Sequence, residues 1–175
     1  MTSLPRTNFG NPILRKKAKR VTLAQLKSPT FKRLIKDMFH TVEPIGVGLA
    51  APQVGKSLQL AVIDIHSLQH RPNVEPYKQV IINPEILSYS KEQDAMYEGC
   101  LSFVGLRAEA HRSKRIQVRY IDEKGEKHTE WIEGFRARVF QHEIDHLNGT
   151  LFVDRVIDTH TILTTEEYTK RVQGK

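Results

Sequence analysis

Two histidines four residues apart, with a glutamate beside the first, form the strongest chemical signal in the sequence: His142-Glu143-Ile144-Asp145-His146. Residues four apart lie one above the other on one face of an α-helix, so both imidazoles can bind a single metal ion. Glu143 points about 100° further round the helix. From there it can reach a water molecule bound to the metal, whose pKa the metal lowers from about 15.7 towards 7. The pattern therefore indicates metal-dependent hydrolysis, with Glu143 as general acid and base.

The third ligand of such a site has two candidates in the sequence. Glu166 and Glu167 follow His146 by 20 and 21 positions, a separation similar to that of thermolysin-like peptidases. Their simpler interpretation is the acidic first turn of a capped helix. Cys100 would bind as a thiolate and leave one tetrahedral position open, and Gly99 before it lets the backbone come close. This combination favours Cys100, while two ordinary surface histidines on a helix remain the alternative to any metal site.

The elements that must position these side chains are predicted from apolar spacing and from capping and turn signals. The predicted helices run from about Pro29 to His40, from Gly134 to Asn148-Gly149, and from about Thr164 onwards. The predicted strands are Leu58–Ile65, one or two short strands around Asn83-Pro84 in Val80–Leu87, Ile116–Tyr120, and His128–Ile132. We therefore expect an α+β fold: short, mostly antiparallel sheets around a central metal-binding helix, with an N-terminal and a C-terminal helix.

Composition sets limits on the class of protein. The chain has 175 residues, which suits one domain, and we expect residues 1–175 to form a single catalytic domain. The single cysteine excludes an internal disulfide. No apolar run approaches the length of about 20 residues that spans a bilayer, so we expect no membrane contact. The net charge is +7, and no acidic residue precedes Asp37.

An early basic run consists of Arg15, Lys16, Lys17, Lys19 and Arg20. Such a run could contact the ribosome or another nucleic acid, although a solvated surface is the more common explanation. No aromatic interleaving or nucleic-acid-binding motif accompanies it, so we expect no sequence-specific binding of nucleic acid.

Three segments together carry a resemblance to a known family. They are Gly46-Val47-Gly48-Leu49-Ala50-Ala51-Pro52-Gln53, Glu98-Gly99-Cys100-Leu101-Ser102 and Gln141-His142-Glu143-Ile144-Asp145-His146. In this order and spacing they resemble the three signature motifs of the peptide deformylases. The resemblance covers roughly residues 10 to 157, and it departs from the usual pattern at Phe103-Val104, where many members have an apolar residue and then proline.

The resemblance implies a role for each motif. Cys100, His142 and His146 would bind the metal, with Glu143 as general acid and base. The side-chain amide of Gln53 and the backbone N–H of Leu101 would stabilise the formyl oxygen as it becomes an oxyanion. The implied metal is one Fe²⁺ per chain, for which Zn²⁺, Ni²⁺ or Co²⁺ can substitute.

The same resemblance implies how a peptide would be held. The backbone of Val47, Gly48 and Gly99 would pair with an extended substrate, and Arg107 would lie near it. Val47, Phe135 and Val139 would line the pocket for the methionine side chain. Plain core packing is the alternative for Val139 and Phe135, and an exposed charge at a strand edge is the alternative for Arg107. Glu98 and Arg112 would form a structural brace for the cysteine loop.

The function implied is removal of the N-formyl group from the formylmethionine of nascent polypeptides, with release of formate. Because the resemblance begins near Gly10, we expect no full organellar presequence and a cytoplasmic enzyme. We also expect a monomer, with transient ribosome contact through the basic run. A peptidase that uses Glu166 or Glu167, and a relative that binds peptide without hydrolysing it, are the alternatives.

Overall fold

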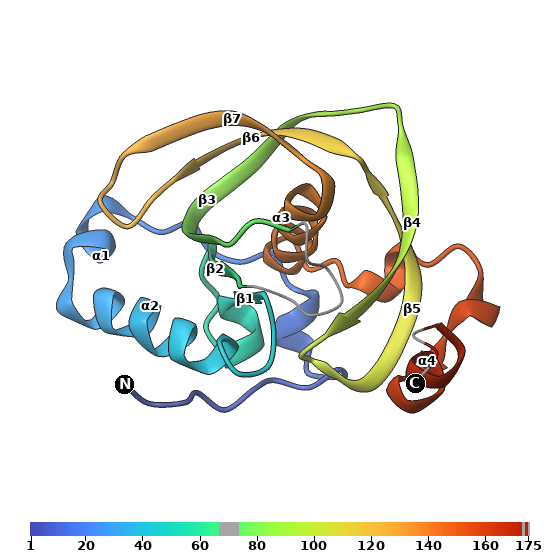
Figure 1. The fold of residues 1–175 in the computed structure, drawn as a ribbon. Helices are drawn as coiled ribbons and strands as arrows, with labels where there is room; N and C mark the ends of the chain where they lie inside the picture. The colour runs from blue at the N-terminus through green and yellow to red at the C-terminus, as the bar shows by residue number, and fades with distance from the viewer. Residues whose placement is uncertain (67–73, 173, 175) are drawn as a thin grey trace.

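The computed structural model describes residues 1–66, 74–172 and 174, and part of the polar stretch from His66 to Tyr77 lies outside them. Helix α3 (Gly134–Leu147) lies inside the curve of two sheets (Figure 1). The five-stranded sheet has the order β1 (Gly48–Ala50), β2 (Leu60–Ile65), β3 (Tyr77–Tyr89), β6 (Arg115–Ile121) and β7 (Lys127–Glu133). The second sheet has the order β4 (Gln93–Cys100), β5 (Phe103–Ser113) and β8 (Leu163–Thr164). All pairings between these strands are antiparallel, which confirms the predicted α+β class.

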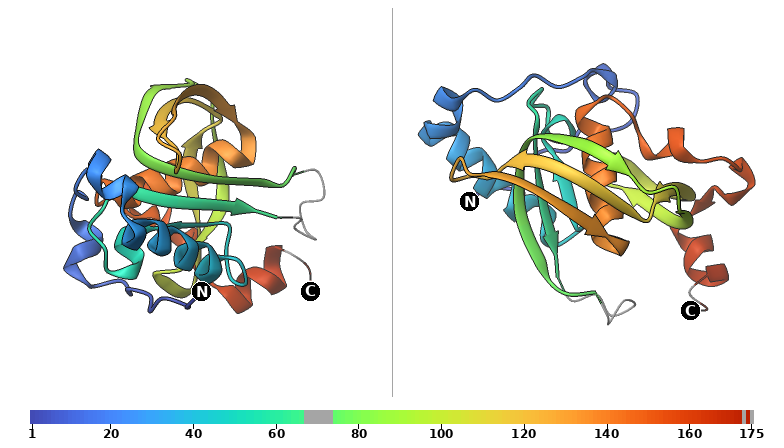
Figure 2. Two further views of the ribbon diagram at one scale, coloured as in Figure 1. Left: turned by 90° about the vertical axis from the view of Figure 1, so that its left-hand side faces the viewer. Right: turned by 90° about the horizontal axis from the view of Figure 1, so that it is seen from above.

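The remaining helices lie outside the sheets. The α-helices are α1 (Leu23–Lys27), α2 (Pro29–Val42) and α4 (Thr165–Val172). The short 3₁₀ helices are η1 (Pro12–Arg15), η2 (Ala51–Val54), η3 (Phe152–Arg155) and η4 (Thr159–Thr161). The view from above places α1 and α2 on the opposite side of the molecule from α4 (Figure 2, right). None of the helices described is long and apolar enough to cross a membrane.

Capping groups explain where α2 and α4 begin. The Ser28 hydroxyl accepts a hydrogen bond from the backbone N–H of Phe31, and Pro29 occupies the first turn, where its missing N–H costs nothing. The Thr164 hydroxyl accepts a bond from the backbone N–H of Glu167. Both helices therefore begin within one residue of the position predicted.

Strand β2 is buried on both faces, which explains why it is apolar at every position except Asp64. Ala61 and Ile63 belong to the core between the sheet and α3, whereas Leu60 and Val62 belong to the core between the sheet and α2. Successive side chains of a strand point to opposite faces, so a strand between two helix layers is apolar on both of them. Helix α3 is thereby packed against the sheet along its predicted apolar stripe. The Asp64 carboxylate, near the end of the strand, is paired with Lys78.

Strand β3 continues through Asn83-Pro84, where the sequence suggests a break. Its register against β6 shifts between Ile82 and Glu85, and Asn83 adopts a positive φ of 51°. The amide of Asn83 accepts from the N–H of Val21 at 2.8 Å and donates to its carbonyl at 2.9 Å. A bulge that accommodates the proline, together with these two bonds, keeps a single strand intact.

Candidate metal centre and active site

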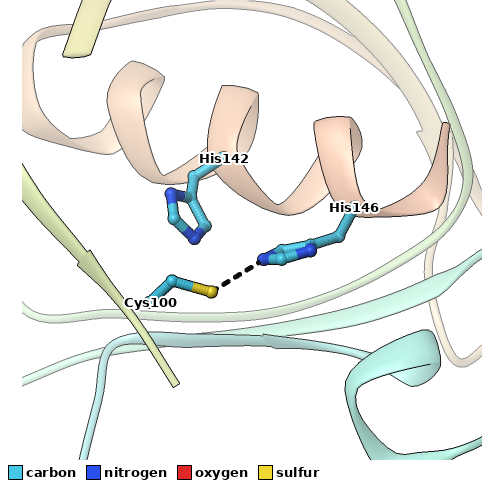
Figure 3. A group of neighbouring side chains, drawn as sticks. All are labelled: Cys100, His142 and His146. Atoms are coloured by element: carbon cyan, nitrogen blue, oxygen red, sulfur yellow. Dashed lines mark hydrogen bonds between the residues drawn. The ribbon is translucent and has the colours of Figure 1, made fainter. Parts of the chain in front are cut away.

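Cys100, His142 and His146 point toward one another (Figure 3). One ligand atom from each, the Sγ of Cys100 and one ring nitrogen of each histidine, lies within 4.8 Å of the others. The Sγ of Cys100 is 3.2 Å from Nε2 of His146, and the two imidazole centroids are 5.0 Å apart. The cysteine comes from the end of β4 and the histidines from consecutive turns of α3. Two distant segments thus supply the donor set that the sequence favoured.

The His142 ring is oriented by Glu98, which also lies on β4. Its Nδ1 lies 2.8 Å from Oε2 of the Glu98 carboxylate, which leaves Nε2 as the atom available to a metal. Burial would raise the pKa of Glu98, but hydrogen bonds from His142 and Arg112 lower it well below its ordinary range. Glu98 therefore acts as an ionised acceptor that fixes the tautomer of His142.

Glu143 is buried on the side of α3 that faces β1. Its carboxylate packs against the α-carbon of Gly48, so closely that a β-carbon at that position would lie 2.8 Å from Cδ of Glu143. The other oxygen, Oε2, is buried and has no hydrogen-bond partner within the described part of the chain. Burial raises the pKa of Glu143 to about 7. A carboxylate with that pKa is suited to both taking up and releasing a proton near neutral pH.

Gln53 lies on η2 and is 1% exposed. Its Oε1 accepts a hydrogen bond from the backbone N–H of Ala50 at 2.8 Å, which fixes which end of the amide faces the site. The Nε2 donor lies 3.4 Å from the Cys100 sulfur and 3.4 Å from the Ser102 hydroxyl. Leu101 occupies the turn between Cys100 and Ser102. An amide donor and the peptide of Leu101 thus lie beside the ligand atoms.

A cavity of about 510 Å³ opens beside these groups. Its lining includes every residue predicted to contact substrate: Val47, Gly48, Gly99, Arg107, Phe135 and Val139. Cys100, His142, Glu143, Gln53 and Leu101 also line it. A cleft of this size with apolar walls and a few convergent polar groups is typical of a ligand site.

Glu166 and Glu167, the alternative ligands, lie elsewhere. They pair with Lys170 and Arg171 along α4. Among the residues described, neither belongs to a cluster of potential ligand atoms.

The residues present fit a bound metal ion. One thiolate and two imidazoles suit Zn²⁺ or Fe²⁺ and leave a coordination position free. The unpartnered Oε2 of Glu143 fits a site in which a further polar species is held. Nδ1 of His146 is also buried without a partner in the described residues, so Glu98 orients only one of the two rings.

A model of the polypeptide deformylase family matches residues 5–161. The chain belongs to this family. Its members remove the N-formyl group from nascent peptides in a metal-dependent hydrolysis. The resemblance drawn from the three motifs is thereby confirmed.

Curated relatives and solved structures of the family cover most of the chain. A peptide deformylase of Thermotoga neapolitana is 47% identical over 149 residues, 85% of this chain and 84% of the relative. The structure of a class I type b peptide deformylase from Acinetobacter baumannii, bound to Met-Ala-Ser, is 37% identical with a TM-score of 0.85 and covers 89% of this chain and 99% of that one. The Thermotoga maritima enzyme is 43% identical with a TM-score of 0.78, over 90% and 100% of the two chains.

Sequence reasoning missed the ionic network behind the candidate metal ligands. The Arg112–Glu98 pair was expected, but Arg138 also donates to Glu98, and Asp145 accepts from both Arg112 and Arg155. Arg138 precedes His142 by four residues, so helical spacing alone placed it on the same face. The β4–β5 hairpin was missed as well, because its polar strands lack clear apolar alternation.

Proposed function

We propose that this chain hydrolyses the N-formyl group of N-terminal formylmethionine in nascent polypeptides and releases formate. The observation that carries the proposal is the convergence of Cys100, His142 and His146 beside a cleft. Cys100 and His142 line this cleft together with Glu143 and Gln53. We further infer that residues 1–175 act as one catalytic domain.

Cys100, His142 and His146 would hold the metal. When bound, the ion acts as a Lewis acid and makes water a stronger nucleophile at neutral pH. The buried Glu98–His142 bond supports this assignment because it leaves Nε2 of His142 facing the thiol side of the site. By the family resemblance we propose Fe²⁺ as the working ion, for which Zn²⁺, Ni²⁺ or Co²⁺ can substitute.

Glu143 would move the proton. Its buried carboxylate takes a proton from the attacking water as the water oxygen bonds to the formyl carbon. It then delivers a proton to the methionine nitrogen as the carbon–nitrogen bond breaks. The products are formate and a free amino terminus. The pKa of about 7 supports both steps, since neither protonation state is strongly disfavoured.

Gln53 Nε2 and the backbone N–H of Leu101 would donate to the formyl oxygen as negative charge develops on it. Preorganised donors in a site shielded from water are often the largest electrostatic contribution to catalysis. The bond from Ala50 to the Gln53 oxygen supports this role because it prevents the amide from turning its acceptor toward the oxyanion.

The peptide would extend from this point along the cleft. Val47, Gly48 and Gly99 would pair with its backbone as an added strand does. Val47, Phe135 and Val139 would surround the methionine side chain, and Arg107 would lie beside the residues that follow. All six line the same cavity as Cys100 and His142.

The cellular location, oligomeric state and ribosome contact of the enzyme are proposed from the sequence. We propose a cytoplasmic monomer that meets nascent chains at the ribosome, with the run of Arg15, Lys16, Lys17, Lys19 and Arg20 as the contact surface. Reversing the charges of Lys16, Lys17 and Lys19 should abolish low-salt cosedimentation with ribosomes. Cosedimentation that survives the reversal would count against this contact.

A formate-release assay tests the central proposal. Protein purified anaerobically is analysed for metal and then given formyl-methionyl peptides under reducing conditions. We expect one metal ion per chain and one formate released for each peptide deformylated. Peptide binding without formate release would indicate a non-catalytic relative, and cleavage inside the peptide would indicate a peptidase.

A further inference from the structure

Arg138 is a buried arginine one helical turn before His142 on α3. Its side chain is 5% exposed. A guanidinium is almost never buried to this degree unless it is paired. Its contacts therefore identify what it holds in place.

Arg138 completes the hydrogen bonding of Glu98. Oε1 of Glu98 accepts from Nε of Arg112 at 2.9 Å and from Nη1 of Arg138 at 2.7 Å. Oε2 accepts from Nη2 of Arg112 at 3.0 Å and pairs with Nδ1 of His142 at 2.8 Å. A carboxylate offers about four acceptor positions. All four are used, so the carboxylate that orients His142 is held from every side.

Arg138 also joins the histidine helix to the strands that carry the cysteine. It donates to the carbonyl of Ala110 on β5 at 2.9 Å, to the carbonyl of Asp94 on β4 at 3.0 Å, and to the Asp94 carboxylate. Cys100 stands at the end of β4, and the histidines stand on α3. One guanidinium thus spans the two elements whose separation sets the distance from thiol to imidazole.

We propose that Arg138 is a positioning residue for the metal centre: by clamping the β4–β5 hairpin and Glu98 against α3, it sets the geometry of Cys100 with His142 and His146. The inference rests on the metal-dependent function proposed above, but it predicts a change in the affinity for the metal rather than in the rate of hydrolysis. Partners behind metal ligands typically change metal affinity about 10- to 100-fold when they are removed.

The test is a titration of the metal-free, reduced protein with Co²⁺. Binding is monitored by the visible absorption of the protein-bound Co²⁺, which reports thiolate and imidazole coordination. Arg138→Met keeps an unbranched apolar stem and removes the guanidinium. We expect the Kd for Co²⁺ to rise about tenfold or more and the thiolate-to-cobalt band to shift or weaken. Formate release is measured in parallel, so that a failure of the deformylase proposal is distinguishable from a failure of this one.

Two control variants separate a positioning role from a merely structural one. Asp94→Ala removes the outer contact of Arg138 but leaves Glu98 saturated. Arg155→Met removes a guanidinium that pairs with Asp145 and not with Glu98. Arg155→Met should retain the wild-type Kd and spectrum. Asp94→Ala keeps the bonds of Arg138 to Glu98 and to the carbonyls of Ala110 and Asp94, so it should raise the Kd much less than Arg138→Met does. The proposal is overturned if either control raises the Kd as much as Arg138→Met, or if folded Arg138→Met binds Co²⁺ as the wild type does.

Arg138→Lys carries the test if Arg138→Met does not fold. Lysine keeps the charge, but one ammonium cannot span Glu98, Ala110 and Asp94 together. A Kd between those expected for wild type and for Arg138→Met supports the clamp. A wild-type Kd and spectrum for Arg138→Lys would overturn it.

Discussion

Gly48 and Glu143 lie so close together that no side chain fits between them. A β-carbon on Gly48 would lie 2.8 Å from Cδ and 3.0 Å from Cγ of Glu143, and its nearest contact would be Oε1. The backbone of strand β1 therefore packs directly against the Glu143 carboxylate. The glycine is required there for close approach, not for backbone conformation, since its φ is not positive.

Gly48→Ala should displace the Glu143 carboxylate while leaving the metal ligands in place. We expect kcat to fall about 10²-fold or more, within the range that general acid–base catalysis contributes, with metal content unchanged. Gly46→Ala is the matched control, because its β-carbon would meet only side-chain carbons outside Glu143, those of Leu101 at 3.3 Å and of Val42 at 3.4 Å. Equal losses in the two variants would argue against a specific role for the Gly48 contact. The measurements are steady-state kinetics and metal stoichiometry.

Glu143→Gln removes the proposed proton carrier and keeps the volume of the side chain. Deformylation should fall about 10²- to 10⁴-fold with one ion still bound. The neutral amide of glutamine should be well tolerated at this buried position, because burial also favours the neutral form of Glu143 and raises its pKa. Metal analysis and formate release on the same sample provide the check. Retention of activity would require another base.

Cys100→Ser should remove metal binding and activity together, because a hydroxyl is a far weaker ligand than a thiolate for this ion class. The double variant Glu166→Gln/Glu167→Gln is the comparison, since both glutamates are placed on α4 and paired with Lys170 and Arg171. It should retain both metal and activity. The opposite result would restore the peptidase interpretation.

Arg112→Leu should destabilise the fold strongly. Arg112 is 3% exposed and pairs with Glu98 and Asp145, and removing one partner of a buried ion pair typically costs about 3–5 kcal/mol. Arg119→Ala removes one partner of the exposed pair with Glu85, for which about 0–1 kcal/mol is expected. Urea denaturation of the metal-free proteins measures both free energies of unfolding. Similar losses would contradict the assignment of the buried network as structural support.

The turn between β6 and β7 should contribute stability that depends on pH. Burial alone would raise the pKa of Asp122, but His128 and the backbone N–H groups of Glu126 and Lys124 lower it overall. A depressed pKa means that the contribution is present above the unfolded-state value of about 4 and is lost as pH falls through the lower folded-state value. Asp122→Asn should cost about 1 kcal/mol at pH 7 and progressively less in acid. A difference independent of pH would refute this origin.

The sequence alone indicated the kind of chemistry and the helices α2, α3 and α4, although not the short α1. The spacing of His142 and His146 needs only the helical repeat, and the capping residues Ser28 and Thr164 act on their own backbone neighbours. These are local effects, readable from adjacent residues. The deformylase motifs likewise pointed to Cys100 through their order and spacing.

Only the tertiary structure decided the features that depend on contacts between residues far apart in the sequence. The β4–β5 hairpin, the passage of β3 through Asn83-Pro84 and the clamp of Arg138 on Glu98 depend on partners far apart in the chain. Polar strands such as β4 show no clear apolar alternation, and a buried arginine looks like any surface cation until its acceptors converge. The meeting of Cys100 with the histidines required folding for the same reason: their separation is set by packing between a hairpin and a helix.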